Sequence, residues 1–185
     1  MYEKFGQFID GKWSSSENNE TYEVINPATE EILGHASKAT PVDVDKALKS
    51  AEKGLAVWRK TPPWQRSYIL RKIADKMRVK KDVLAKWMTL ENGKPLAEGV
   101  GETNGAADIF EWNAEETKRI YGQTIESRFE DTRVHVYYQP VGVIAALSPW
   151  NFPLILAARK ISTALAAGCS VIIKPDTITP GVVME

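Results

Sequence analysis

The amide side chain of Asn151 stands in an unusual setting. The segment "LSPWNFPL", residues 147–154, places it among two large aromatic residues and two prolines, directly after an apolar run. Asn at such a point is a favoured cap for the N-terminus of the helix that follows. Its NH2 group is also a donor that could stabilise an oxyanion on a substrate carbonyl. The spacing alone favours the cap and leaves the second role open.

Lys174 is the second residue that could carry chemistry. It ends the apolar run "CSVIIK" and begins the segment "KPDT". A lysine at the end of a strand is commonly only a solvated side chain. A cation at the ligand-binding edge of a sheet would also suit ribose hydroxyls or phosphate. Both interpretations stay open.

Two basic residues follow on the segment after Asn151. Counted from Phe152, the helical positions i+3, i+4 and i+7 are Ile155, Leu156 and Arg159, which share one side of a helix. Arg159 could be a surface residue with its apolar stem along that stripe. Its guanidinium could also bind a substrate carboxylate. Lys160 lies on a different side of the helix.

The single cysteine, Cys169, stands between Gly168 and a β-branched apolar run, where a small buried thiol is the default. His35 and His135 are far apart in sequence, and neither is near enough in sequence to serve as its base. We therefore expect no catalytic role for Cys169 and no metal site. A lone cysteine forms no internal disulfide, which suits a reducing cytoplasm.

The segments around these residues predict one βαβ unit. "VGVIAAL", residues 141–147, is continuously apolar, as a parallel strand buried on both faces should be. A helical segment follows and ends at Gly168, and "CSVIIKP" is a second strand. Thr179 as N-cap and Pro180 at the first helical position predict the start of another helix. The order indicates an α/β fold with an open parallel sheet.

In such sheets, ligands bind outside the carboxyl ends of the strands. If the two strands are parallel neighbours, "SPWN" and "KPDT" lie at the same edge. Asn151 and Lys174 would then face a common crevice. A single crossover cannot cover both faces of a parallel sheet, so the predicted fold looks unfinished.

The upstream part predicts hairpins followed by helices. Asp10-Gly11 and Asn26-Pro27 are turn signals within two short strand pairs. Apolar residues spaced by three and four predict one helix over residues 44–58. They predict a second helix from residue 69 that continues through Met88 to a stop at "ENGKP".

A third helix, over about residues 96–120, is weakened by Gly99, Gly101 and Gly105. The segment "TRVHVYYQP" alternates polar and apolar residues over 133–138, which predicts a half-buried strand.

Composition excludes several classes of protein. The 185 residues suggest one domain, with 43% hydrophobic and 26% charged residues and a net charge of zero. No basic stripe indicates nucleic-acid binding, and no apolar stretch is long enough to cross a bilayer. The start, "MYEKFGQFIDGKW", lacks the pattern of a signal peptide. We expect a cytoplasmic protein.

The segments "PVGVIAALSPWNFPL" and "AAGCSVIIKPDTITP" together resemble the aldehyde dehydrogenase superfamily. The likeness extends over the whole chain, including "INPATEEILG" and "TLENGKPLAE". "MTLENGKPLAEGVGE" and "AEETKRIYG" look most like the succinate- and glutarate-semialdehyde branch. The resemblance implies an incomplete Rossmann-like cofactor-binding domain with N-terminal β-hairpins and a helical segment.

The resemblance also implies roles for residues of this chain. Asn151 matches the donor to the thiohemiacetal oxyanion, and Lys174 the lysine that holds the adenosine ribose. Lys160 matches a lysine near the active site. The expected lining of the cofactor groove is Leu147, Ser148, Pro149, Trp150, Pro175, Asp176 and Thr177, and the expected tunnel wall is Phe152, Ile155 and Leu156.

Two positions bear on substrate and cofactor. Arg159 falls where semialdehyde dehydrogenases carry an arginine for the far carboxylate, which implies a short semialdehyde as substrate. Thr177 stands where NAD-preferring members usually carry a glutamate that repels a 2′-phosphate. The cofactor expected is NAD or NADP, with a lean to NADP, although Asp176 would partly restore the repulsion.

The family's nucleophilic cysteine and its glutamate base belong to a later catalytic domain that is absent from this chain. Residues 1–185 are therefore expected to be the N-terminal part of the cofactor-binding domain, with residues 141–185 its first βαβ unit, and inactive alone. Residues 122–140 are a candidate oligomerisation strand region of a homo-oligomer. A natural truncated binding or assembly module is one alternative, and an unrelated nucleotide-binding α/β domain is another.

Overall fold

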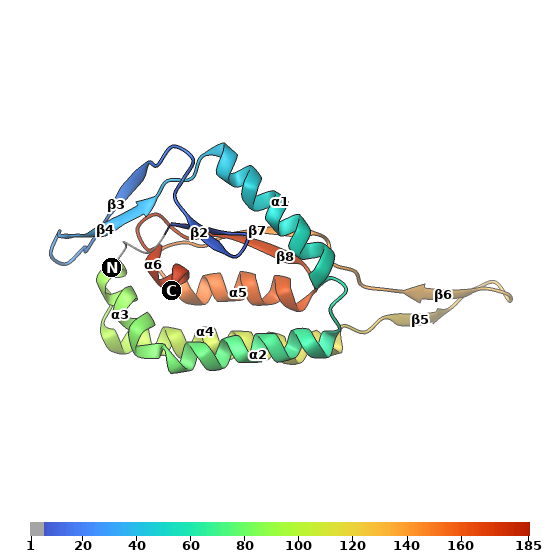
Figure 1. Cartoon of the computed structure of the whole chain (residues 1–185). Coiled ribbons are helices and arrows are strands. Elements are labelled where there is room, and N and C mark those ends of the chain that lie inside the picture. Colours follow the sequence, from blue (N-terminus) through green and yellow to red (C-terminus); the bar gives the residue numbers. More distant parts are fainter. Residues whose placement is uncertain (1–5) are drawn as a thin grey trace.

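The computed structural model describes residues 6–185, an α/β arrangement of short hairpins, a helical layer and one βαβ unit (Figure 1). The expectation about a signal peptide rests partly on residues 1–5, which lie outside the described residues. Within residues 6–185, none of the helices has the length and apolar character needed to span a membrane.

Two antiparallel hairpins open the described chain, as the turn signals predict. The first joins β1 (Gln7–Ile9) to β2 (Lys12–Ser14), and Asp10 and Gly11 both have positive φ at its turn. The second joins β3 (Thr21–Ile25) to β4 (Ile32–Ser37). Val24 and Ala36 are the buried residues of this second pair, which therefore contributes to the core.

Four α-helices follow, where the sequence predicts three. They are α1 (Pro41–Trp58), α2 (Pro63–Val79), α3 (Lys81–Asn92) and α4 (Leu96–Glu116), and α4 continues into the short 3₁₀ helix η1 (Thr117–Arg119). The single helix predicted from residue 69 to "ENGKP" is wrong, because the chain breaks at Lys80. The apolar face continues across this break, and periodicity alone does not reveal it.

The glycines of α4 serve close packing. A Cβ atom on Gly99 would lie 2.9 Å from the backbone oxygen of Ala85 in α3, so the two helices meet at backbone contact. A Cβ on Gly105 would lie 3.1 Å from the Ile155 side chain. Gly101 has open space around it. The residues that lower the helix propensity of α4 are therefore partly those that let it approach its neighbours.

The βαβ unit consists of β7 (Val143–Leu147), α5 (Pro153–Ala166) and β8 (Ser170–Lys174), and the two strands pair in parallel. Figure 1 shows α1 on one side of this strand pair and α5 on the other, with α2 and α4 forming a layer beyond α5. A helix from outside the crossover thus covers the second face. The prediction that β7 is buried on both faces is wrong in this chain, because only Ala146 of that strand is buried.

Small residues dominate the core between the helices. Ala74, Ala106, Ala107 and Ala114 are fully buried with Leu70, Met88 and Phe110, which allows α2, α3, α4 and α5 to pack closely. On α1, by contrast, Val44 and Leu48 of the predicted apolar face remain exposed in the described chain.

A long hairpin made of β5 (Gln123–Glu126) and β6 (Arg133–Val136) projects from the body (Figure 1). The half-buried strand predicted over residues 133–138 is wrong in its burial, because β6 is exposed except at Val136, which is half-buried. Polar and apolar side chains do alternate along β6, but no other layer of the described chain packs against either face of this two-stranded ribbon.

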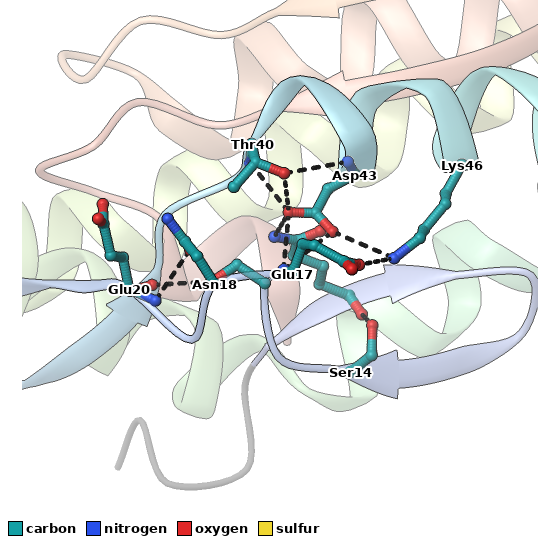
Figure 2. Close-up of polar contacts among 9 residues, drawn as sticks. Ser14, Glu17, Asn18, Glu20, Thr40, Asp43 and Lys46 are labelled. Atoms are coloured by element: carbon teal, nitrogen blue, oxygen red, sulfur yellow. Dashed lines mark hydrogen bonds and ion pairs between the residues drawn. The ribbon is translucent and has the colours of Figure 1, made fainter.

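The carboxylate of Asp43 ties the N-terminal segments to α1 (Figure 2). It accepts hydrogen bonds from the Thr40 backbone N–H at 2.9 Å, from the Glu17 N–H at 3.1 Å and from the Gln7 side chain at 3.3 Å. The pKa of Asp43 is lowered to about 2, and the hydrogen bond from the Thr40 N–H is the largest cause. Burial acts in the opposite direction. The bonds from the Glu17 N–H, the Thr40 hydroxyl and the Gln7 side chain lower the pKa further. One carboxylate therefore holds three segments far apart in sequence.

Asp43→Asn should loosen this junction and remove its acid sensitivity. A pKa of about 2 in the folded state, against 3.8 otherwise, stabilises the fold above about pH 4, and this contribution is lost as the pH falls from about 4 to 2. We expect a lower melting temperature at pH 6 and a flatter fall below pH 4. Asp45→Asn, on the exposed side of the same helix, is the matched control; equal effects of both substitutions would contradict the assignment.

Gly99→Ala and Gly101→Ala should change stability in opposite directions. The first places a methyl group against the backbone of α3, whereas the second adds helix propensity in open space, about 0.5–1 kcal/mol in favour of folding. Urea unfolding of both variants gives the two free energies. Stabilisation by both would show that α3 and α4 do not meet as described.

Candidate functional site

The carboxyl ends of β7 and β8 lie together, as the βαβ prediction requires. Leu147 pairs with Lys174 in the parallel register, and the Ser148 backbone N–H donates to the Lys174 carbonyl at 3.1 Å. The Ser148 hydroxyl is buried and donates to the Pro153 carbonyl at 3.1 Å. The segments "SPWN" and "KPDT" therefore share one edge of the sheet.

Asn151 does not cap the helix, so that interpretation is wrong. Helix α5 begins at Pro153 and its N-cap residue is Phe152, without a side-chain hydrogen bond. The Asn151 side chain is exposed, and its Oδ1 accepts from the Phe152 backbone N–H at 3.1 Å. This bond occupies the amide oxygen, and Nδ2 has no partner among residues 6–185. The amide is thus available to a ligand at this edge.

The N-terminus of α5 is satisfied instead by Glu102 of α4. Its Oε1 accepts from the Leu154 N–H at 2.9 Å and from the Ile155 N–H at 3.1 Å. A carboxylate at this position also matches the positive end of the helix dipole. The start of the helix that carries Ile155 and Arg159 is therefore set by a residue 52 positions earlier.

Lys94 forms a buried ion pair with Glu102 and contacts the same segment. The two side chains are 7% and 2% exposed. The Lys94 ammonium also donates to the Asn151 carbonyl at 3.2 Å and lies 4.6 Å from the centre of the Phe152 ring. Two residues before Lys94, the Asn92 amide donates to the Trp150 carbonyl at 3.0 Å.

The residues after β8 form a turn beside Asn151. The Lys174 side chain is exposed, and so is that of Thr177. Asp176 is half-buried, and its Oδ1 accepts from the Ile178 N–H at 3.2 Å. Burial first, and the Asp176 charge second, raise the pKa of Tyr22. Asp176 is thus engaged within its own turn and near the second hairpin.

The final helix, α6 (Gly181–Met184), begins one residue later than predicted. Pro180 is its N-cap and Thr179 is not; the Thr179 hydroxyl is buried without a hydrogen-bond partner in the described chain. The carboxylate of Glu91 in α3 satisfies the start of α6 instead. It accepts hydrogen bonds from the Gly181 N–H at 2.7 Å and from the Val182 N–H at 3.1 Å. Burial raises the pKa of Glu91 to about 8, although these two donors oppose the shift.

The remaining predicted residues lie along α5. Phe152 and Arg159 are exposed, Leu156 is half-buried, and Ile155 is half-buried against Gly105 of α4 and the core. Arg159 forms no ion pair with any residue of the described range, so its guanidinium is free. Lys160 is half-buried, and its ammonium donates to the Leu156 carbonyl at 3.4 Å, one turn earlier on α5.

Cys169 is buried and unpaired, in the setting expected of a structural thiol. Gly168, with a φ of 87°, ends α5 as predicted. In residues 6–185 no group of three or more His, Cys, Asp or Glu side chains is arranged to hold a metal ion.

Sequence reasoning missed the side chains that fix this edge: Glu91, Asn92, Lys94 and Glu102. All four stand in "ENGKPLAEGVGE", residues 91–102, whose local pattern predicts only a helix stop followed by a glycine-weakened helix. The groups that they hold at this edge lie between 52 and 91 residues further along the chain, beyond the reach of local patterns. The one local signal is that Lys94 and Glu102, which carry opposite charges, stand in a segment rich in small and apolar residues.

Known proteins resemble this chain over nearly its whole length. The glutarate-semialdehyde dehydrogenase of Pseudomonas aeruginosa is 45% identical over 94% of the chain. The NADP(+) succinate-semialdehyde dehydrogenase of Escherichia coli K12 is 45% identical over 93% of it. The chain spans about 36% of the length of each of these relatives.

Solved structures agree with the sequence matches. An E. coli NADP-dependent enzyme superposes with a TM-score of 0.94 and 44% identity, covering 95% of this chain and 37% of that one. A betaine aldehyde dehydrogenase of Staphylococcus aureus in complex with NAD+ gives a TM-score of 0.94 at 34% identity, covering 98% of this chain and 37% of that one. The hairpins, helical layer and βαβ unit are thus part of the aldehyde dehydrogenase fold.

The sequence profile of the aldehyde dehydrogenase family matches residues 13–185. Residues 13–185 include the helices α1 to α4 and the whole βαβ unit that carries Asn151 and Lys174. The chain belongs to the aldehyde dehydrogenase family.

Proposed function

We propose that this chain is the cofactor-side part of an NAD(P)-dependent semialdehyde dehydrogenase, and that Asn151 donates to the oxyanion formed from the aldehyde. The observation that carries the proposal is the Asn151 side chain, whose oxygen is held by the Phe152 N–H while Nδ2, at the ligand edge of the sheet, has no partner among residues 6–185. A donor fixed in this way stabilises charge on a carbonyl oxygen without reorganising.

The residues at the same edge fit a dinucleotide. Lys174 places an exposed cation at the end of β8, suited to ribose hydroxyls, and the backbone of residues 147–150 runs beside it. Pro175, Asp176 and Thr177 complete this side of the groove. When bound, the dinucleotide supplies the nicotinamide ring that accepts the hydride; this chain's residues bind and orient it.

The substrate we propose is a short aldehyde with a distal carboxylate, as in succinate or glutarate semialdehyde. Arg159 is exposed and unpaired in the described chain, two turns along α5 from Asn151. An arginine with both nitrogens free binds a carboxylate through two parallel hydrogen bonds. Phe152 and Leu156 lie on the same side of the helix and form the apolar wall between them, with Ile155, while Lys160 supplies a positive charge close by.

We propose that the nucleophile and the base of the reaction are not among residues 1–185, and that these residues alone do not oxidise aldehydes. We propose that the protein is a cytoplasmic homo-oligomer, with the β5–β6 hairpin within residues 122–140 as the contact between copies, because that ribbon is exposed on both faces.

The alternative is a non-catalytic module that binds nucleotide or assembles with partners. The exposed Lys174 edge fits the nucleotide-binding form of it.

Arg159→Ala should act on one class of substrate. In the protein as encoded in its gene, we expect the KM for succinate semialdehyde to rise about tenfold or more and the KM for butanal to change less than about twofold, because only the first carries a carboxylate. Steady-state assays with NADP+ give both values. Arg119→Ala, an exposed arginine on η1, is the control. Equal effects on both aldehydes would remove Arg159 from the substrate site.

Thr177 should allow NADPH to bind. A neutral hydroxyl at this position leaves the 2′-phosphate without a repelling charge, so fluorescence titration should give NADPH a Kd no weaker than that of NADH. Thr177→Glu should weaken NADPH by about tenfold and NADH by much less. Thr132→Glu, in the exposed hairpin, controls for the added charge. A clear preference of the unmodified protein for NADH would refute the assignment.

A further inference from the structure

Three side chains from the end of α3, the turn after it and the first part of α4 hold the backbone around Asn151. Asn92 donates to the Trp150 carbonyl at 3.0 Å, and Lys94 donates to the Asn151 carbonyl at 3.2 Å. Glu102 accepts from the Leu154 and Ile155 N–H groups at 2.9 and 3.1 Å. The backbone is thus anchored immediately before, at and after the residue that we propose as the oxyanion donor.

The ion pair at the centre of this arrangement is costly to bury. Removing two charges from water carries a large desolvation cost, and replacing such a pair by apolar side chains is often neutral or stabilising. The side chains of Lys94 and Glu102 are only 7% and 2% exposed, so an apolar pair at these positions could stabilise the fold equally well. Stability alone is therefore a weak explanation for an ion pair here. What an apolar pair could not do is donate to the Asn151 carbonyl and accept from the α5 N-terminus at the same time.

The two charges also depend on each other through geometry. The Lys94 ammonium bonds Oε2 of Glu102, while Oε1 accepts both helix N–H groups. The Lys94 ammonium also lies over the Phe152 ring. It therefore contacts both residues of the hydrogen bond between the Phe152 N–H and the Asn151 Oδ1. A shift of Lys94 moves the Asn151 carbonyl and, with it, the direction of Nδ2.

We propose that Lys94 and Glu102, assisted by Asn92, are positioning residues that fix the direction of the Asn151 amide. This inference rests on the role proposed above for Asn151. The contacts of Lys94 and Glu102 with this segment are to the backbone of residues 151, 154 and 155 and to the Phe152 ring, so they act through the placement of that backbone. The buried ion pair is in this view part of the oxyanion site rather than of the core.

The test uses Lys94→Met and Asn92→Ala in the protein as encoded in its gene, with Arg78→Met as the matched control. Arg78 pairs with Asp108 and Glu111 on the outer side of α2 and α4, away from the strand ends. We expect Lys94→Met to lower kcat about 10- to 100-fold, since a small misplacement of a donor is that costly, and to leave the KM for NADP+ within about twofold. Asn92→Ala should lower kcat in the same direction by less.

The decisive comparison repeats Lys94→Met and Asn92→Ala in an Asn151→Ala background. If they act through the Asn151 amide, each should then lower kcat by less than about twofold. A loss that keeps its full size without Asn151 would overturn the proposal. If Lys94→Met does not fold because it leaves Glu102 unpaired, Asn92→Ala decides, since it leaves the buried ion pair intact.

Hydrogen exchange followed by mass spectrometry separates this inference from the proposed function. Lys94→Met and Asn92→Ala should speed exchange in residues 150–155, and Arg78→Met should not. Unchanged exchange in both would overturn the positioning role whether or not the protein oxidises aldehydes. If the unmodified protein oxidises no aldehyde while exchange responds as expected, the proposed function fails and the anchoring of the segment stands.

Discussion

The first N–H groups of a helix have no partner within that helix, and a buried helix start must find acceptors elsewhere. In this chain, both helices of the βαβ region meet that requirement in the same way. Glu102 serves the start of α5 and Glu91 the start of α6. Because each helix follows a parallel strand, these two carboxylates also fix the loops at the carboxyl ends of β7 and β8. The position of the ligand edge of the sheet therefore depends mainly on two side chains of the helices α3 and α4.

Parts of the fold with local causes could be predicted from the sequence. The Asp10-Gly11 turn, the end of α3 at Gly93 and the end of α5 at Gly168 each depend on residues that tolerate positive φ. The parallel pairing of β7 and β8 followed from two apolar runs separated by one helix. The break at Lys80 could not be predicted, because the apolar stripe of α2 and α3 runs through it unchanged.

Burial was the weaker part of the prediction. An apolar or alternating strand pattern indicates which faces a strand can bury, but the pattern does not say whether a neighbouring layer is present in the same chain. β6 alternates correctly and is exposed, and Leu147 of an apolar strand is 64% exposed. The positions of Asn151 and Lys174 at one edge were predictable from topology. The direction of the Asn151 amide depends on Asn92, Lys94 and Glu102, which no local pattern connects to it.

The order of these elements along the chain has a consequence for synthesis. Glu91 and Glu102 precede their partners by 90 and 52 residues, and domains emerge from the ribosome N-terminus first. The helical layer therefore exists before the strands that it will organise. Until α5 and α6 are made, neither carboxylate has the helix N–H donors that it binds in the folded chain. The nascent chain thus carries both acceptors at the place where the βαβ unit will dock before their donors have been synthesised.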